Sequence, residues 1–313
     1  MAVVIGEKET RRLIDMPRAV KLVEEMFRDR AAGRTRSIPR RRLKGSEKQL
    51  NFMAAWHGGA DLLCLRAYAG ASNTITLYNG RTGEIRAIVN AGYLSSLRTG
   101  AASGVAARYL APPTTDTLGI VGPGWQATFQ VEAIVHACKI REILVYGRNS
   151  KKINAFIKEM KRTVRVPFQE AASLEQVERE SDIFVLATDA AQPLTDGRVL
   201  KDECLVISMG ANQPVKHEVS GALIRRMDLV TTDDLPTAQT DSGDLIAACN
   251  EGVTRWEKVV PLENVVAGKG PLPRPNRILF QSNGLADEDL AVARYVWEQA
   301  KKKKAKVRAV NEI

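Results

Sequence analysis

The sequence has few cysteines and histidines, and both shortages narrow the chemistry that it can perform. Its 313 residues include four cysteines and three histidines. No C-x-x-C pair occurs and no cysteine stands at ligand spacing from a histidine, so we expect no metal site and reduced thiols in a reducing compartment. The cysteines stand singly in mostly apolar surroundings: Cys64, Cys138, Cys204 and Cys249. The histidines show no triad pattern, and we expect them to be structural: His57, His136 and His217.

Long apolar runs are missing as well. No stretch approaches about 18 uninterrupted apolar residues, so no membrane span and no membrane partner are predicted. The opening "MAVVIGEKETRRL" meets charge too early for a signal peptide, and we expect a cytoplasmic protein. The chain has 313 residues, of which 44% are apolar, and this is enough to form the cores of two domains.

The excess of positive charge does not indicate a nucleic-acid partner. The formal charge is +10, but much of the excess lies in "IPRRRLKGSEK" and in the tail "KKKKAKVR". Neither segment has interleaved aromatic residues for base stacking, and the chain carries no zinc or helix-turn-helix signature. The tail is interpreted as a solvated, fraying helix end, where cations suit the helix dipole.

The hydrophobic pattern changes near residue 113 and indicates an α/β fold with two domains. After that point, strands such as "TLGIV", "EILVYG", "DIFVLAT", "CLVISMG" and "DLVTTDD" alternate with helices, which predicts a parallel sheet covered on both faces. Before it, an amphipathic helix and the strands of "TITLYNGRTGEIRAIVN" indicate an α+β unit with an antiparallel sheet. We expect residues 113–285 to form a Rossmann domain and residues 1–112, completed by the helix in 286–313, to form the other.

A glycine motif follows the first of these parallel strands. Gly122, Gly124 and Ala127 give G-x-G-x-x-A between a predicted strand and a predicted helix. The first glycine allows the tight turn, the second lets the backbone approach a pyrophosphate, and the small third residue lets the helix pack closely. The helix N-terminus then presents N–H groups to the phosphates. The alternative is a structural turn without a ligand.

The end of the second strand predicts which dinucleotide is preferred. An acid there would bind the ribose hydroxyls of NAD, but "VYGRNSKK" contains no Asp or Glu. Arg148 instead offers a fork of donors that suits a 2′-phosphate, and we assign it to cofactor binding together with Asn149. We therefore expect NADP(H) rather than NAD(H). Thr188, which ends the strand "DIFVLAT", is predicted to lie near the nicotinamide.

Five blocks in order, "LSSLRTGAASGVAARYLA", "LGIVGPGWQA", "ISMGANQPVKHEV", "DSGDL" and "FQSNGLADEDLAVAR", make the chain resemble the ornithine cyclodeaminase and mu-crystallin family. The resemblance implies a substrate and dimerisation domain completed by the C-terminal helix, with a Rossmann domain between, and therefore a homodimer. Members of this family are NAD(P)-dependent cyclodeaminases, ketimine reductases or amino-acid dehydrogenases. All act on a small α-amino or α-imino acid.

Two arginines are candidates for binding the substrate carboxylate. Hydride transfer to an imino acid requires the imine carbon at about 3 to 3.5 Å from the nicotinamide, and a bidentate arginine can hold the carboxylate in that position. Arg98, on the small-residue helix before the glycine turn, matches the family's carboxylate-binding arginine. Arg41 matches a second one in a P-x-R context, although Arg40 and Arg42 leave the register open. Asp289 matches a family acid close to the active site and is assigned to the cofactor side, or it only favours the helix dipole.

The sequence departs from the family at two positions. Arg66 stands where the family usually has a lysine that takes part in proton transfer, and arginine is a very poor acid or base. Asn212 stands where cyclodeaminases have an aspartate that acts on the amine, and an amide cannot be a general base. Oxidation and cyclodeamination both require the amine to lose a proton first, whereas reduction of a preformed imine does not.

We therefore expect an NADP(H)-dependent reductase of a small ketimine or imino acid, in which Arg98, with Arg41 or Arg66, holds the carboxylate. A second guanidinium from Arg66 would suit a substrate with two carboxylates, such as iminosuccinate. One alternative is an ornithine cyclodeaminase or an alanine dehydrogenase, in which Asp233 or Asp234 would replace the missing aspartate. The other is an NADPH-binding protein with little turnover.

Overall fold

The computed structural model describes residues 2–271, 273–302 and 308–310, and its contacts divide the chain into two compact units. Unit 1 comprises Met1–Thr99 with Leu285–Ile313, and unit 2 comprises Gly100–Gly284. Helix α3 (Gly92–Leu110) belongs to both units, because the division falls between its residues Thr99 and Gly100. The sequence placed the boundary at 112/113, where two prolines end this helix.

Unit 1 is built on a seven-stranded sheet in the order β15-β1-β6-β5-β4-β3-β2. Strands β2 to β6 pair antiparallel in sequence order, as expected, but β1 lies parallel to β6, so the sheet is mixed. The sequence pattern revealed neither β1 nor β15, which have four and three residues. The strands are β1 (Ala2–Ile5), β2 (Thr35–Lys44), β3 (Gln49–His57), β4 (Leu62–Ala69), β5 (Ser72–Asn79), β6 (Ile85–Asn90) and β15 (Arg308–Val310).

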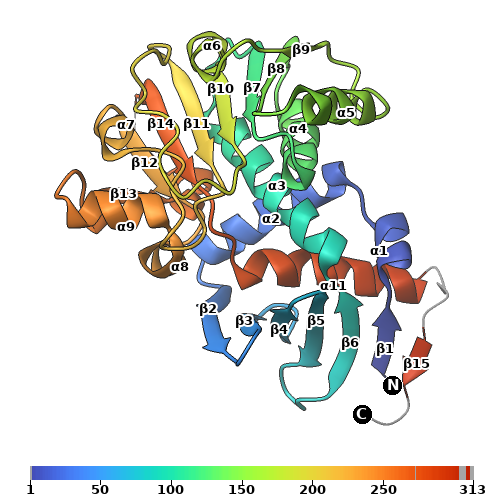
Figure 1. Cartoon of the computed structure of the whole chain (residues 1–313). Coiled ribbons are helices and arrows are strands. Elements are labelled where there is room, and N and C mark those ends of the chain that lie inside the picture. The colour runs from blue at the N-terminus through green and yellow to red at the C-terminus, as the bar shows by residue number, and fades with distance from the viewer. Residues whose placement is uncertain (1, 272, 303–307, 311–313) are drawn as a thin grey trace. The chain divides into compact units, whose positions relative to one another are not determined.

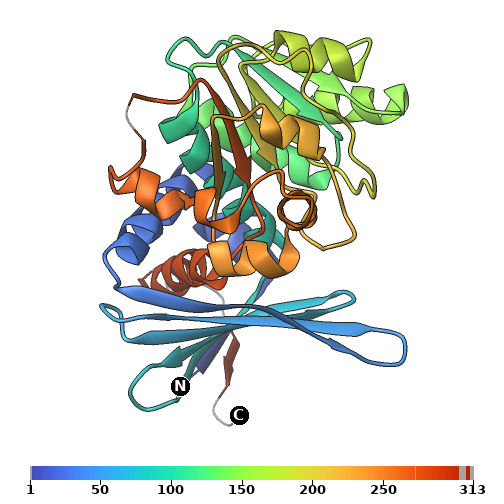
Figure 2. The ribbon, with the colours of Figure 1, turned by 90° about the vertical axis from the view of Figure 1, so that its left-hand side faces the viewer.

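The helices of unit 1 are α1 (Glu7–Leu13), α2 (Met16–Ala31), α11 (Ala286–Lys302) and the first part of α3. Asp15 caps α2 by accepting the Arg18 N–H at 3.0 Å. Helix α11 packs against α2 and against strands β2 to β6, and Figure 2 shows it along one face of the sheet. The predicted basic helix end is described only to Lys302, and residues 303–307 of the tail lie outside the described residues.

Unit 2 is built on an eight-stranded sheet in which every pairing is parallel, in the order β13-β12-β14-β11-β10-β7-β8-β9. Figure 1 shows its central strands side by side. The strand order reverses between β7 and β10, and such a switch point is where open α/β sheets bind their ligands. The strands are β7 (Thr117–Val121), β8 (Glu142–Tyr146), β9 (Phe168–Glu170), β10 (Ile183–Leu186), β11 (Cys204–Ser208), β12 (Leu229–Thr232), β13 (Val259–Pro261) and β14 (Arg277–Gln281).

Helices and a 3₁₀ turn connect these strands, and α3 contributes its second part to the same unit. Gly100 of α3 lies so close to α4 that a Cβ would be 2.5 Å from the Phe129 carbonyl oxygen. The small residues of α3 thus allow close packing on another helix. The connecting elements are α4 (Trp125–Ala137), α5 (Ser150–Met160), α6 (Leu174–Glu180), α7 (Gly221–Arg225), α8 (Leu235–Asp241), α9 (Gly243–Asn250), η1 (Trp256–Lys258) and α10 (Leu262–Val266).

Two findings concern the helices and the cysteines of the described residues. None of their helices is both long and apolar enough to cross a membrane. All four cysteines are thiols without a disulfide, and Cys64 and Cys204 are buried. Burial raises the pKa of the Cys204 thiol to about 12, so this side chain behaves as a small apolar residue.

Candidate active site

The glycine turn after β7 has the geometry of a dinucleotide-binding turn. Gly122 has φ +89°, and a Cβ there would lie 2.6 Å from the Ala187 carbonyl oxygen, so the position requires glycine. Gly124 is the N-cap of α4, no described side chain caps the helix, and a Cβ on Gly124 would meet no described atom within 4 Å. Ala127, in the first turn of α4, is fully buried. Open space above uncapped N–H groups fits a pyrophosphate.

The end of β8 carries the residues expected to select the cofactor. Arg148 is exposed, whereas the Asn149 side chain caps α5 by accepting the Lys152 N–H at 3.1 Å. The parallel neighbour β9 also brings Glu170 to this edge, where it accepts the Ser150 hydroxyl at 2.7 Å. The stretch "VYGRNSKK" could not reveal this acid, because Glu170 comes from a strand 20 residues further on.

The loop after β10 lies beside the glycine turn, and the loop after β11 lies beside that loop. A Cβ on Gly122 would be 2.8 Å from the Thr188 side-chain methyl, so Thr188 packs directly on the turn. Asn212 follows β11, is half-buried, and donates its N–H to the Gly210 carbonyl at 2.9 Å. Within unit 2, the structure therefore gathers these residues at the carboxyl edge of the sheet.

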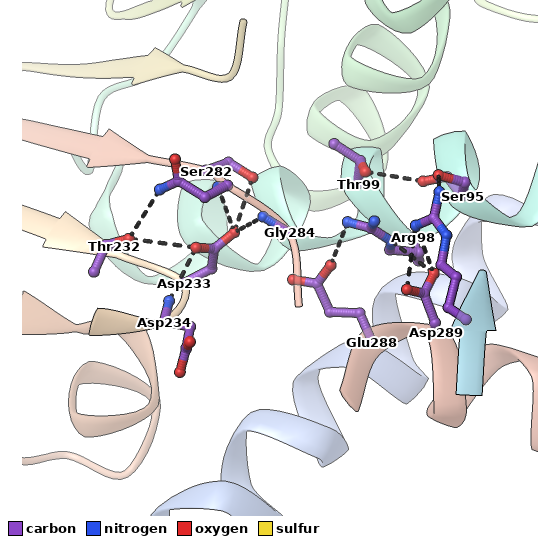
Figure 3. A network of polar contacts seen from close by, with 12 residues as sticks. Ser95, Arg98, Thr99, Thr232, Asp233, Asp234, Ser282, Gly284, Glu288 and Asp289 are labelled. Carbon is purple, nitrogen blue, oxygen red and sulfur yellow. Dashed lines mark hydrogen bonds and ion pairs between the residues drawn. The ribbon is translucent and has the colours of Figure 1, made fainter. Parts of the chain in front are cut away.

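Unit 1 holds a buried cluster of arginines and acids at the start of α11. Arg98 donates from Nε to Asp289 at 3.0 Å and from Nη1 to Glu288 at 2.8 Å, as Figure 3 shows. Arg66 donates from Nη1 to both oxygens of Asp289 at 3.2 Å and from Nη2 to the Ser95 hydroxyl at 2.7 Å. Both arginines are at most 5% exposed and both acids are fully buried. The Asp289 carboxylate thus joins Arg66 to Arg98.

The charges of this cluster compensate one another. Burial lowers the pKa of Arg66, the neighbouring charges of Arg98 and Arg40 lower it further, and the Asp289 carboxylate opposes them. Asp289 and Glu288 also lie in the first turn of α11, where the helix dipole favours negative charge. The structure therefore places Asp289 with the carboxylate-binding candidates of unit 1.

The structure brings Arg40, not Arg41, toward this cluster. Arg40 is 9% exposed and close enough to Arg66 to affect its pKa, whereas Arg41 is exposed. The cause is a bulge: Ile38 pairs with Ala54 and Arg41 with Phe52, so β2 has one residue more than β3 between these pairs. Strict alternation from buried Thr35 would place residue 41 inward, and the extra residue moves the inward position to residue 40.

The acid run "ADEDL" forms a buried group of ion pairs that motif spacing alone did not reveal. Asp287, the residue before the Arg98 partners, is also buried and pairs with Arg30 at 2.5 Å and with the Thr35 hydroxyl. Three consecutive acids in one helical turn thus all lie in the interior of unit 1. An isolated helix-start acid needs no such partners, so their burial beside arginines excludes a role limited to the helix dipole.

The two aspartates considered as replacement bases are both committed to the backbone of unit 2. Asp233 accepts the N–H groups of Asp234, Asn283 and Gly284 at 2.6 to 2.9 Å, and the Ser282 hydroxyl at 3.2 Å (Figure 3). Asp234 caps α8 by accepting the Thr237 N–H at 2.9 Å. These contacts occupy oxygens of both carboxylates, so a substrate amine would have to displace backbone N–H groups to reach them.

The strand order and the glycine turn define unit 2 as a Rossmann-type dinucleotide-binding unit. The family model described as the ornithine cyclodeaminase/mu-crystallin family matches residues 2–304, and the chain belongs to that family. This confirms the resemblance found in the sequence.

Three solved structures are similar over nearly the whole chain. Delta(1)-pyrroline-2-carboxylate reductase of Thermococcus litoralis, in complex with NADH and L-proline, is 26% identical with a TM-score of 0.92, and the match covers 98% of this chain and 100% of that one. Iminosuccinate reductase of Paracoccus denitrificans in complex with NAD+ is 26% identical with a TM-score of 0.90, and the match covers 100% of this chain and 99% of that one. An archaeal alanine dehydrogenase dimer with bound NAD is 28% identical with a TM-score of 0.91, and the match covers 98% of this chain and 99% of that one.

Proposed function

We propose that this protein is an oxidoreductase that reduces the C=N bond of a small imino acid to give an amino acid. The observation that carries the proposal is the buried pair of Arg66 and Arg98, joined through Asp289, in a chain that also has a dinucleotide-binding turn. The similar structures include two reductases that are named for imino-acid substrates.

Arg98 and Arg66 bind the substrate carboxylate in this proposal. Asp289 and Glu288 hold the guanidinium groups in fixed orientations, which lowers the entropy cost of binding. Arg40 takes the place predicted for Arg41 and brings a third guanidinium to the cluster. Three guanidinium groups can compensate the negative charge of a second carboxylate on the substrate. Dicarboxylic imines such as iminosuccinate therefore belong to the proposed substrate class.

The cofactor binds at the glycine turn, with Gly122, Gly124 and Ala127 in the roles described above. Arg148 at the end of β8 favours NADP(H), and Asn149 orders the start of α5 beside it. When bound, the reduced nicotinamide supplies the hydride. Thr188, which packs on Gly122, adjoins the nicotinamide half of the site.

The proposed direction of the reaction, from imine to amine, follows from the side chains considered for proton transfer. Asn212 cannot accept a proton from a substrate amine, and Asp233 and Asp234 are held by backbone N–H groups. Arg66 cannot deliver a proton either, because its conjugate base is too strong. The substrate that suits this site is an iminium that is already protonated in solution.

The functional unit in this proposal is a homodimer formed through the outer face of the unit 1 sheet. Ile38, Leu43, Leu50 and Leu63 are each at least 38% exposed, and the strand register puts them on one face. The opposite face is covered by α11. Exposed apolar side chains gathered on one sheet face are typical of an interface, and one of the similar structures is a dimer.

The proposal is tested by following nicotinamide oxidation with pyrroline-2-carboxylate, piperideine-2-carboxylate, iminosuccinate, and pyruvate with ammonia, each with NADPH and with NADH. Turnover with one imine supports the reductase and identifies its substrate class. An Arg98→Ala variant is expected to lose this turnover while it still binds the cofactor. Ammonia release from ornithine without imine reduction would indicate a cyclodeaminase, and cofactor binding without any turnover would indicate a binding protein.

A further inference from the structure

Unit 2 contains a second buried cluster of carboxyl groups, which the proposed chemistry does not use. Glu218 and Asp244 are at most 1% exposed. The Ser208 hydroxyl lies between them, 2.8 Å from Glu218 Oε2 and 3.2 Å from Asp244 Oδ2. Burial raises the pKa of both carboxyls, and together with the nearby Glu218 it brings the pKa of Asp244 to about 7.

Glu218 joins the chain segments that follow β10 and β11. Its Oε1 accepts the Thr188 N–H at 2.6 Å and the Thr188 hydroxyl at 2.8 Å, and its Oε2 accepts the Gly210 N–H at 2.8 Å. Thr188 packs on Gly122, and Gly210 precedes Asn212 by two residues. One carboxylate therefore fixes the loop that packs on the glycine turn to the loop that follows β11.

The block "DSGDL" holds the same loops from the other side. Asp244 accepts the backbone N–H of Glu218 at 3.0 Å. Gly243 donates its N–H to the Ala211 carbonyl at 3.1 Å, and a Cβ on Gly243 would overlap the Lys216 carbonyl oxygen. This explains why a glycine and an aspartate stand at the start of α9, a pattern whose purpose the sequence did not reveal.

The contacts of Ser208 determine where a proton resides. A hydroxyl has one hydrogen, so it cannot donate to two ionised carboxylates at once. All contacts are satisfied when Asp244 carries a proton and donates to Ser208, and Ser208 donates to Glu218. The other charged groups around Asp244 are His217, with Nδ1 at 3.6 Å, and Arg225 and Glu251, which line the same pocket. In this arrangement Glu218 has four hydrogen-bond donors on its two oxygens.

We propose that Glu218 is a positioning residue for hydride transfer, which acts through the backbone of Thr188 and Gly210 on the nicotinamide half of the cofactor site. The proposal rests on the function proposed above. A dinucleotide spans the switch point of a Rossmann unit, so its adenosine half adjoins β7 and β8 and its nicotinamide half adjoins β10 and β11. The Glu218 carboxylate accepts hydrogen bonds from Thr188, Ser208 and Gly210, at the ends of β10 and β11.

The test is a Glu218→Gln variant titrated by calorimetry. The ligands are whichever of NADPH and NADH the wild type binds more tightly, and the matching adenosine fragment, 2′,5′-ADP or ADP. The amide NH₂ would face a backbone N–H, so the loops lose their anchor. We expect affinity for the reduced dinucleotide to fall about 10-fold, while affinity for the fragment changes less than about twofold.

Glu178→Gln is the matched control. Glu178 is also buried and accepts the Thr195 hydroxyl at 2.5 Å and the Val199 N–H at 3.2 Å, so it anchors a loop that does not adjoin the glycine turn. This variant should melt at a lower temperature and bind both ligands as the wild type does. If Glu218→Gln does not fold, Ser208→Ala removes one of the donors to Glu218 and should weaken dinucleotide binding about threefold, again without effect on the fragment.

Equal weakening of dinucleotide and fragment, or no weakening of either, would overturn the assignment, and so would the same pattern in Glu178→Gln. These titrations require no imine. They can therefore succeed even if the substrate panel shows no turnover, and they can fail even if the protein is a reductase.

Discussion

Replacing Arg98 with lysine tests the carboxylate clamp most directly. Alanine would leave Glu288 and Asp289 buried without their guanidinium partner, and breaking a buried ion pair costs about 3 to 5 kcal/mol of stability. Lysine keeps the positive charge but cannot make two parallel hydrogen bonds to a carboxylate. Loss of one charge-assisted hydrogen bond costs about 2 kcal/mol, which corresponds to about a 30-fold fall in kcat/KM.

Arg30→Lys is the control for this variant. Arg30 pairs with Asp287 in the same turn of α11 but lies outside the proposed clamp, so the substitution disturbs the start of the helix in a similar way. We expect kcat/KM for the imine to fall only in Arg98→Lys, with cofactor affinity unchanged in both variants. If both variants lose the same activity, or if Arg98→Lys retains full kcat/KM, Arg98 does not bind the substrate carboxylate.

Four further substitutions test other parts of the structure. Arg148→Ala should raise the KM for NADPH about 10-fold and leave that for NADH unchanged; an equal change in both would contradict the assignment to the 2′-phosphate. Gly122→Ala should lower the melting temperature and weaken cofactor binding, because its φ is +89° and the new Cβ meets the Ala187 carbonyl oxygen; wild-type values of both would refute this. Leu43→Asp should weaken the dimer in sedimentation experiments, since it places a charge on the proposed interface. The folded protein holds a proton on Asp244 up to about pH 7 that the unfolded chain releases near pH 4. As the pH rises from about 4 to about 7, the stability of the wild type should therefore fall relative to that of Asp244→Asn. If the melting temperatures of the two proteins change in parallel over this range, the carboxyl is not protonated.

The sequence predicted the parts of the fold whose signal is local. The continuous apolar runs of β7, β10 and β11 required burial on both faces, and this is enough to infer a parallel sheet. Strands β1 and β15 were not predicted, because their pairing partners lie far away in the chain and nothing local places them in the sheet. The strand β14 between β11 and β12 was missed for the same reason: its place depends on the order of the whole sheet.

The candidate site was predictable in type but not in register. Arginines in a chain with a dinucleotide turn led us to expect a carboxylate-binding cluster, and within unit 1 Arg98 and Arg66 do lie together on the Asp289 carboxylate. The choice between Arg40 and Arg41 depends on a bulge in β2, and three successive arginines give no sign of where the extra residue lies. Glu170 was likewise out of reach, because only the pairing of β8 with β9 brings it to the same edge as Arg148.

The contacts of the carboxylates within each unit also favour a reductase over a cyclodeaminase. Asp289 and Glu288 are bound by guanidinium groups, Asp233 and Asp234 by backbone N–H groups, and Glu218 by the ends of two strands. Each of these carboxylates therefore already has hydrogen-bond or ion-pair partners, which a substrate amine would have to displace. A reaction that begins by deprotonating an amine needs a carboxylate without such partners, and Asn212 stands where the resemblance places the aspartate of the cyclodeaminases. Reduction of a protonated imine needs none, because the nitrogen already carries its proton when the hydride arrives at carbon.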